Sequence, residues 1–203
     1  MRSFRALLFL LLVLFFLAAC GSGQVVSPSP VPVTQTAPSL TPVCTHAALT
    51  VPLTEGPYFK AGSPERASLL EDGVTGVKLV LSGSVLTADC QPVAHALLEF
   101  WQADANGQYD NSGYTLRGHQ FSDANGRYQL TTIIPGLYPG RTEHIHVKVQ
   151  PPGGATLTTQ LFFPGVTQND EDGIFDPSLV LPIQDAPDGK TATFDFVVNV
   201  PRP

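Results

Sequence analysis

The sequence predicts an all-β fold, an antiparallel β-sandwich with functional loops. From Lys78 onward, short runs of β-branched and aromatic residues are separated by Gly, Asn, Asp and Pro, which is the pattern of strands joined by turns. Many of these runs alternate apolar and polar residues, as half-buried strands do. The predicted strands span residues 78–86, 96–104, 126–133, 144–150, 156–163 and 193–200. Only residues 63–73 favour a helix, and a short one.

Residues 1–19 have the pattern of a secretory signal peptide. Arg2 and Arg5 precede an apolar run that ends in small residues, and this run is too short for a membrane span. The segment Leu17–Cys20 resembles the bacterial lipobox, in which the chain is cut before the cysteine and the thiol carries the lipid. The sequence therefore predicts a lipoprotein of the bacterial cell envelope, anchored outside the cytoplasm through Cys20. Ordinary secretion, with a cysteine near the cut site, is the alternative.

Residues 20–43 form a predicted tether, and residues 44–203 form the predicted domain. The tether is rich in Ser, Thr, Val and Pro and has no charged residue, which favours an extended chain. Cys44 and Cys90 are the two cysteines of the domain. Outside the cytoplasm such a pair is expected to form a disulfide rather than a catalytic or metal site. The net charge of -6 and the scattered basic residues argue against nucleic acid as a partner.

A pair of histidines marks the candidate functional site. His144 and His146 lie two residues apart in a predicted strand, so both imidazoles project from one face and can share a metal ion. Two histidines alone are a weak signal, because satisfied or exposed histidines are commoner than ligands. Tyr138 stands just upstream in the turn-rich segment PGLYPG. Histidines with a tyrosine favour a hard trivalent ion over zinc, because a phenolate is ionised at neutral pH only beside a strong positive charge.

The motifs around these residues resemble those of the intradiol ring-cleavage dioxygenases, the family of protocatechuate 3,4-dioxygenase and catechol 1,2-dioxygenase. The resemblance extends from about residue 54 to 165 and lies in TEGPYF, LEFWQADANGQYDN, LRGHQFSDANGRYQLTTIIPGLYPGRTEHIHVKV and TTQLFFPG. It is strongest to the secreted single-domain members, because the helical dimerisation segment of catechol 1,2-dioxygenases has no counterpart in the sequence. The fold that the family implies is a sandwich of the transthyretin (prealbumin) type.

The resemblance implies a non-haem Fe(III) cofactor held by four residues. The first tyrosine of the family's pattern falls on Tyr109, which follows Trp101 in the W-x-A-x-x-x-G-x-Y stretch. The second falls on Tyr138, and the histidine pair falls on His144 and His146. All four ligand positions of the family are therefore filled in this chain.

The resemblance also implies a reaction and the residues that support it. A catechol-type substrate is cleaved by O2 between its two hydroxyl-bearing carbons, which gives a muconate-type diacid. The substrate displaces Tyr138, Arg141 stabilises negative charge that develops on the ring, and Gln160 orients Arg141 or the oxygenated ring. Pro57 and Tyr58 are expected to line the substrate pocket.

Some features depart from the better-known members of the family. Only five residues separate Tyr138 from His144, and Gly140 stands where many members have a bulky aromatic residue. A more open pocket is the expected consequence. Glu143 is expected to face away from the histidines. The segment QNDEDGIFD at residues 168–176 is interpreted as an acidic, solvated loop rather than a calcium site.

Two other functions fit parts of the sequence. Residues 83–104 also resemble the transthyretin-like or carboxypeptidase-regulatory sandwich, a non-enzymatic module that binds ligands or spaces domains, and fold alone does not confer function. A lipoprotein that binds iron or catechol-type chelators without turnover is the other alternative. The four-residue Tyr and His set distinguishes the chain from a spacer, and Arg141 with Gln160 favours catalysis.

Overall fold

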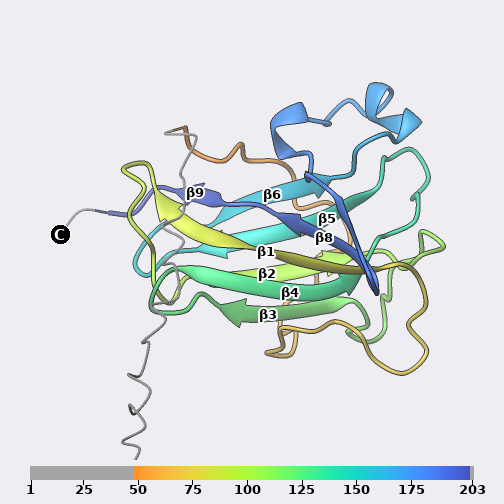
Figure 1. The fold of residues 1–203 in the computed structure, drawn as a ribbon, viewed down its shortest axis with the longest axis horizontal. Helices are drawn as coiled ribbons and strands as arrows, with labels where there is room; N and C mark the ends of the chain where they lie inside the picture. The colour runs from red at the N-terminus through yellow and green to blue at the C-terminus, as the bar shows by residue number, and fades with distance from the viewer. Residues whose placement is uncertain (1–47, 202–203) are drawn as a thin grey trace, which may run out of the picture. The chain divides into compact units, whose positions relative to one another are not determined.

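The computed structural model describes residues 48–201, which form a β-sandwich of two sheets (Figure 1). The predicted signal peptide, the tether, Cys20 and Cys44 lie outside the described residues. The strands are β1 Lys78–Thr87, β2 Leu97–Gln102, β3 Arg117–Phe121, β4 Arg127–Ile133, β5 His144–Gln150, β6 Leu157–Phe162, β7 Gln184–Ala186, β8 Gly189–Thr193 and β9 Phe196–Val198. Two short 3-10 helices, η1 Thr167–Asp170 and η2 Pro177–Leu179, lie between β6 and β7. Within residues 48–201 no helix has the length and apolar character needed to cross a membrane.

The two sheets differ in strand direction. One has the order β3-β2-β5-β6, and all of its pairs are antiparallel. The other has the order β4-β1-β8-β7, with β9 also paired to β1. The predicted β-sandwich is confirmed, but it is not antiparallel throughout, because β1 pairs in parallel with both β8 and β9.

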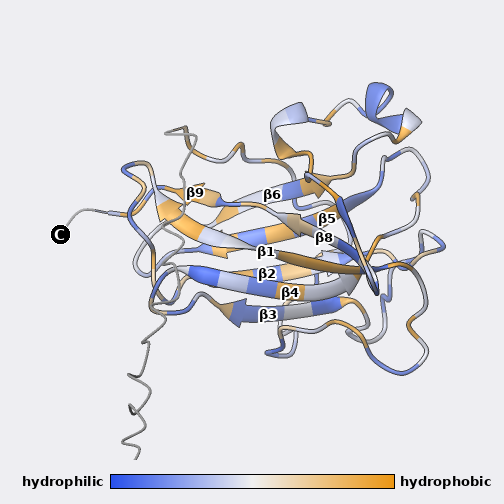
Figure 2. Ribbon diagram, in the orientation of Figure 1, coloured by the Kyte–Doolittle hydropathy of each residue, from blue (hydrophilic) through white to orange (hydrophobic). Residues whose placement is uncertain are grey.

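The core lies between the sheets and is built from alternate residues of each strand. Leu79 and Leu81 of β1 and Ile145 and Val147 of β5 are fully buried in it. Figure 2 shows the resulting change between apolar and polar positions along the strands. Because successive side chains of a strand point to opposite faces, His144 and His146 lie on the face of β5 that points away from this core.

The predicted helix at residues 63–73 is wrong. This segment runs extended beside two strands, and its backbone bonds to both. The Arg66 amide donates to the His119 carbonyl oxygen at 2.8 Å, and the Leu69 amide donates to the Thr131 carbonyl oxygen at 2.8 Å. Hydrogen bonds to neighbouring strands therefore replace those of a helical turn, as tertiary context often dictates.

The predicted strand at residues 193–200 is interrupted in the structure. The Asp195 carboxylate accepts the Ser84 amide at 2.8 Å, where a strand would have supplied a carbonyl. The Phe194 carbonyl approaches β1 so closely that a Cβ on Gly83 would lie 1.8 Å from it. The break separates Thr193, the last residue of β8, from β9. The short strands β3 and β7 and the rest of β8 were not predicted, because they lack a run of β-branched residues.

Cys90 is disulfide-bonded. Its predicted partner, Cys44, lies outside the described residues, so the pairing of these two cysteines stays a prediction.

Candidate active site

The site lies on the outer face of the sheet that contains β5. Directly opposed positions on the four strands place Arg117, Trp101, His146 and Gln160 in one row across this sheet. Opposed residues of neighbouring strands point to the same face, so three strands supply Trp101, His146 and Gln160 as adjacent side chains. All four residues of the row are buried.

Two loops bring the predicted tyrosine ligands to this face. Tyr109 lies in the loop after β2, and Tyr138 lies in the loop between β4 and β5. The loops are packed together, because a Cβ on Gly107 would lie 1.8 Å from the Leu137 carbonyl oxygen. The Gly136 amide also donates to the Asp104 carbonyl at 2.8 Å. A glycine at position 107, with its φ of +76°, therefore allows the two tyrosines to share one site.

The structure brings all four predicted ligands into one group, which we call the His–Tyr cluster: Tyr109, Tyr138, His144 and His146. The two histidine Nε2 atoms lie 3.1 Å apart. The Tyr109 hydroxyl lies 3.2 Å from the His144 Nε2 atom. The ring centres of Tyr109 and Tyr138 are 5.9 Å apart, with the planes at 85°. Two imidazole nitrogens and a phenol oxygen thus converge on one small volume.

Both histidines of the cluster are neutral at physiological pH. Burial lowers the pKa of His144 to about 4 and also lowers that of His146. The His144 Nδ1 atom lies 2.6 Å from the Thr142 carbonyl oxygen. A carbonyl can only accept, so Nδ1 carries the proton and donates it, and the Nε2 lone pair faces the cluster. This is the tautomer that a metal-binding histidine adopts.

The His146 ring is oriented by stacking. It lies parallel to Trp101, with ring centres 4.7 Å apart and planes at 3°. Its Nδ1 atom is buried and has no hydrogen-bond partner among the described residues. A Cβ on Gly56 would lie 3.2 Å from the His146 Cε1 atom, so the backbone of Gly56 also approaches the ring closely. Trp101 and Gly56 therefore both restrict the position of the His146 ring.

The charges around Tyr109 are mostly positive. Burial raises the pKa of Tyr109, whereas Arg141 and Arg117 act in the opposite direction. Arg117 is buried, and its guanidinium donates to the carbonyl oxygens of Tyr58 at 2.5 Å and of Asp110 at 3.1 Å. The guanidinium carbon lies 5.9 Å from the Tyr109 ring centre. The negative charge of an ionised Tyr109 would thus be partly neutralised by Arg117, and a metal cation at the cluster would neutralise it further.

The donor set fits a hard cation. Among residues 48–201 no group of three or more His, Cys, Asp or Glu side chains is placed to hold a metal, so a site here depends on the tyrosines. Two imidazoles whose Nε2 atoms face each other at 3.1 Å and two nearby phenols form such a set. Phenolate oxygen is a hard ligand that a trivalent ion stabilises.

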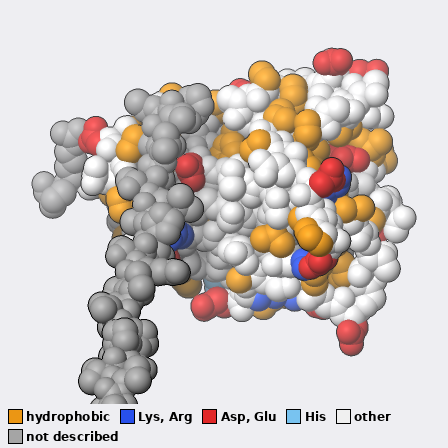
Figure 3. Space-filling view, in the orientation of Figure 1, with side chains coloured by type: hydrophobic (Ala, Val, Ile, Leu, Met, Phe, Trp, Pro, Cys, Tyr) orange, Lys and Arg blue, Asp and Glu red, His pale blue; other side chains and the backbone are white. Residues whose placement is uncertain are grey.

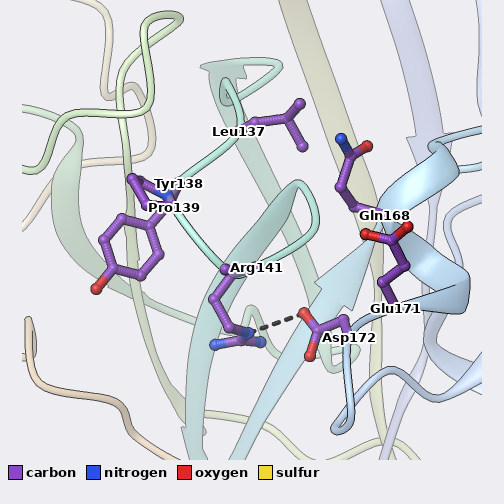
Figure 4. Close-up of a pocket in the computed structure, with 8 residues that line it drawn as sticks. Leu137, Tyr138, Pro139, Arg141, Gln168, Glu171 and Asp172 are labelled. Atoms are coloured by element: carbon purple, nitrogen blue, oxygen red, sulfur yellow. Dashed lines mark hydrogen bonds and ion pairs between the residues drawn. The ribbon is translucent and has the colours of Figure 1, made fainter.

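Arg141 is held beside the cluster by two partners, of which Figure 4 shows Asp172. Its Nε donates to the Asp172 carboxylate at 2.8 Å, and one terminal nitrogen donates to the Gln160 side-chain oxygen at 2.6 Å. The Gln160 amide nitrogen donates in turn to the Thr54 carbonyl at 2.9 Å. The Asp172 side chain is only 3% exposed, and it also accepts the Thr142 amide at 3.0 Å. Arg141 therefore has one fixed orientation.

Of the two predicted pocket residues, one contacts the cluster. Tyr58 donates its hydroxyl hydrogen to the Tyr138 hydroxyl at 3.1 Å and stacks on Tyr109, with ring centres 4.4 Å apart. Pro57 is exposed at the surface beside it. Both stand at the edge of the site, and their role in binding a substrate stays a prediction.

Three residues of the site were missed by reasoning from the sequence. Asp172 belongs to the segment interpreted as solvated, and this is a correction, because its side chain is buried against Arg141. Arg117 and Trp101 were part of the quoted motifs but had no assigned role. A charged residue at a fully buried strand position is a signal only once the strand is known, and β3 was not predicted.

Comparisons with known proteins agree with this geometry. The family model described as "Dioxygenase" matches residues 54–199. A solved dioxygenase domain from Streptomyces sp. SirexAA-E, part of a fusion with a carbohydrate-binding protein, is 51% identical. It aligns with 76% of this chain and 100% of its own at a TM-score of 0.74. The chain belongs to the intradiol ring-cleavage dioxygenase family. The predicted family and its enzyme class, an oxidoreductase, are thereby confirmed.

Two relatives with lower sequence identity are longer than the matched part of this chain. It is 30% identical to the chlorocatechol 1,2-dioxygenase of Pseudomonas sp. (strain P51), over 74% of this chain and 71% of the relative. It is 31% identical to the hydroxyquinol 1,2-dioxygenase of Nocardioides simplex, over 64% of this chain and 53% of the relative. The chain thus spans between about half and about seven tenths of these two dioxygenases.

Proposed function

We propose that this chain is a non-haem Fe(III)-dependent dioxygenase that cleaves a catechol-type ring between its two hydroxyl-bearing carbons. The observation that carries the proposal is the convergence in the His–Tyr cluster. There the Nε2 atoms of His144 and His146 lie 3.1 Å apart, with the Tyr109 hydroxyl 3.2 Å from the first. A cation shared by these atoms and by Tyr138 would satisfy them together. The relatives named above act on chlorocatechol and hydroxyquinol, which supports a diphenol substrate.

Bound Fe(III) would supply the redox chemistry that couples an electron-rich diphenol to O2. Tyr109, Tyr138, His144 and His146 would hold it, and each already has a fixed orientation. The reaction joins one diphenol and one O2, breaks the bond between the two hydroxyl-bearing carbons, and gives one diacid with both oxygen atoms incorporated.

Arg141 would act on the charge that develops on the substrate. Its guanidinium is permanently charged, and it is held in place by Asp172 and Gln160 at 2.8 and 2.6 Å. A fixed cation beside a buried site stabilises negative charge with little reorganisation. Tyr58, which donates to the Tyr138 hydroxyl at 3.1 Å, would keep that phenol hydrogen-bonded when the substrate takes its place.

Oxygen uptake by the full chain, loaded with iron, tests this function. With catechol and isotope-labelled O2, we expect a muconate product that carries two labelled oxygens. Arg141→Ala should keep the iron and lower kcat/KM. The corresponding rise in activation free energy should be about 2 to 4 kcal/mol, the range for loss of a charge-stabilising donor. Lys190→Ala, on β8 of the other sheet, is the matched control. A labelled product with one oxygen, or an Arg141→Ala variant as active as its control, would contradict the proposal.

The second candidate is a protein that binds iron or catechol-type chelators without turnover. The buried, ordered cluster is also what such a protein would need. A catechol-dependent colour change without oxygen uptake would favour this function. The hydrogen bonds of Arg141 to Asp172 and Gln160 favour catalysis, because a binding protein does not need an oriented guanidinium beside the bound ring.

We further propose that the chain is a lipoprotein of the bacterial cell envelope. The support is the sequence Leu17–Cys20 after an apolar run, followed by a proline-rich tether. Membrane fractionation tests this proposal. The full chain should sediment with membranes and incorporate labelled fatty acid, and Cys20→Ser should do neither. A Cys20→Ser variant with unchanged labelling would refute the lipid attachment.

A further inference from the structure

A pocket opens beside Tyr138 and Arg141 and has a volume of about 430 Å³. Its walls are the loop of residues 137–141 on one side and residues 168–172, at η1, on the other (Figure 4). Gly140 is one of the lining residues, and a Cβ at this position would have no atom within 4 Å. A pocket of this size is at the lower end of the range for small-molecule sites and holds more than a bare diphenol ring.

Besides the Tyr138 phenol, the charged residues that line this pocket are Arg141, Asp172 and Glu171. Arg141 and Asp172 form an ion pair at 2.8 Å, so their charges compensate each other. Glu171 is exposed at the pocket and belongs to no ion pair within the described part of the chain. The lining therefore has a net negative charge. Acidic side chains are also visible at the upper right of Figure 3, where Figure 1 places the segment between β6 and β7.

We propose that this pocket selects diphenols whose ring substituents carry no negative charge over those that carry a carboxylate. The inference rests on the proposed function, because it assumes that the two hydroxyl groups lie at the His–Tyr cluster. The far edge of the ring then extends past Arg141 toward the pocket. A carboxylate there meets the unpaired charge of Glu171, whereas the cation of the lining, Arg141, already shares part of its charge with Asp172 at 2.8 Å. Gln168, which also lines the pocket, offers hydrogen bonds to a hydroxyl substituent instead.

The expected size of the effect follows from Coulomb's law. Two unit charges about 7 Å apart in a solvent-exposed pocket repel each other enough to weaken binding by about 3- to 10-fold. The repulsion is screened by salt, so the effect should shrink as ionic strength rises.

Inhibition of catechol turnover by 3,4-dihydroxybenzoate and by its methyl ester measures this selectivity. The two compounds have similar rings but differ in charge, and competition is measurable whether or not either is cleaved. In the full iron-loaded chain, the ester should compete about 3- to 10-fold more tightly than the acid. Glu171→Gln should bring the two inhibition constants together. Asp170→Asn, an exposed neighbour outside the pocket, should leave the ratio as it is in the parent chain.

The outcomes distinguish this inference from the proposed function. Equal competition by acid and ester, or a ratio that Glu171→Gln does not change, would overturn the selectivity while catechol turnover remains. An equal change in Asp170→Asn would also overturn it, because the effect would then belong to the overall charge of the loop. Absence of turnover with catechol would overturn the proposed function, and this inference with it.

Discussion

Replacing Asp172 by Asn is expected to reduce turnover without loss of the proposed iron site. The carboxylate is 3% exposed and accepts the Arg141 Nε at 2.8 Å, while Arg141 itself is 19% exposed. Asn has the same shape but one acceptor oxygen in place of two. In Asp172 one oxygen accepts both the Arg141 Nε and the Thr142 amide, and the other accepts the Ile174 amide at 3.1 Å. The substitution therefore removes the negative charge that faces Arg141 and leaves one oxygen for these three donors.

The magnitude follows from the kind of hydrogen bond that is lost. A hydrogen bond to a charged group contributes about 1.5 to 3 kcal/mol when buried. If half or more of this energy, about 0.8 to 3 kcal/mol, holds the guanidinium in its working orientation, kcat/KM should fall by about 4- to 150-fold, since about 1.4 kcal/mol is tenfold. Iron content should stay at the parent level, because within residues 48–201 no hydrogen bond or ion pair joins Asp172 to a member of the His–Tyr cluster.

The assay is steady-state oxygen uptake with catechol for a double-mutant cycle of Asp172→Asn and Arg141→Ala. If Asp172 acts through Arg141, adding Asp172→Asn to Arg141→Ala should cause little further loss. Asp170→Asn, on the same loop and exposed, is the control. Additive losses in the double variant, or normal turnover in Asp172→Asn, would refute the reasoning.

Three further predictions concern the cluster and its supports. Gly56→Ala should destabilise the fold by about 1 to 2 kcal/mol, because φ is +71° and the new Cβ would lie 3.2 Å from His146; unchanged thermal unfolding and iron affinity would contradict this. Gln160→Leu should lower kcat/KM about 10-fold or more, because Arg141 and the Thr54 carbonyl both lose a partner; a fully active variant would argue that Gln160 does not orient Arg141. In the metal-free chain, the His144 contribution to the free energy of unfolding should be full above about pH 6.5 and should fall by up to about 3 kcal/mol toward pH 4. The reason is that burial lowers the pKa of His144 to about 4, so its imidazole is protonated in the unfolded state before it is protonated in the folded state. Chemical unfolding across this pH range in the parent chain and in His144→Asn should show a smaller slope in the variant, and equal slopes would rule out His144 as the source.

The sequence predicted best those parts of the fold that depend on local alternation. The predicted strand at residues 144–150 agrees with β5 at both ends, because its inner residues are apolar at every second position. The side on which His144 and His146 lie follows from the same period of two. Tyr138 was noted because it lies just upstream of the histidines, and the resemblance to a family then supplied Tyr109. Both tyrosines come from loops that periodicity does not predict.

The elements that were wrong depend on contacts distant in the sequence. Residues 63–73 contain good helix formers, but their amides bond to β3 and β4, and no local pattern indicates this. The role of Asp172 likewise arises only when the segment after β6 packs against the start of β5. In the sequence it is one of several acidic residues in a polar loop, and its burial is a tertiary effect.

The most direct test of a tyrosinate-bound ferric centre is the visible absorption spectrum of the full chain, purified aerobically and loaded with iron. The account predicts a red-brown tyrosinate-to-iron charge-transfer band that shifts when catechol is added, and that is lost in His146→Ala together with the iron. A protein that stays colourless after iron loading, or whose band does not respond to catechol, would contradict it.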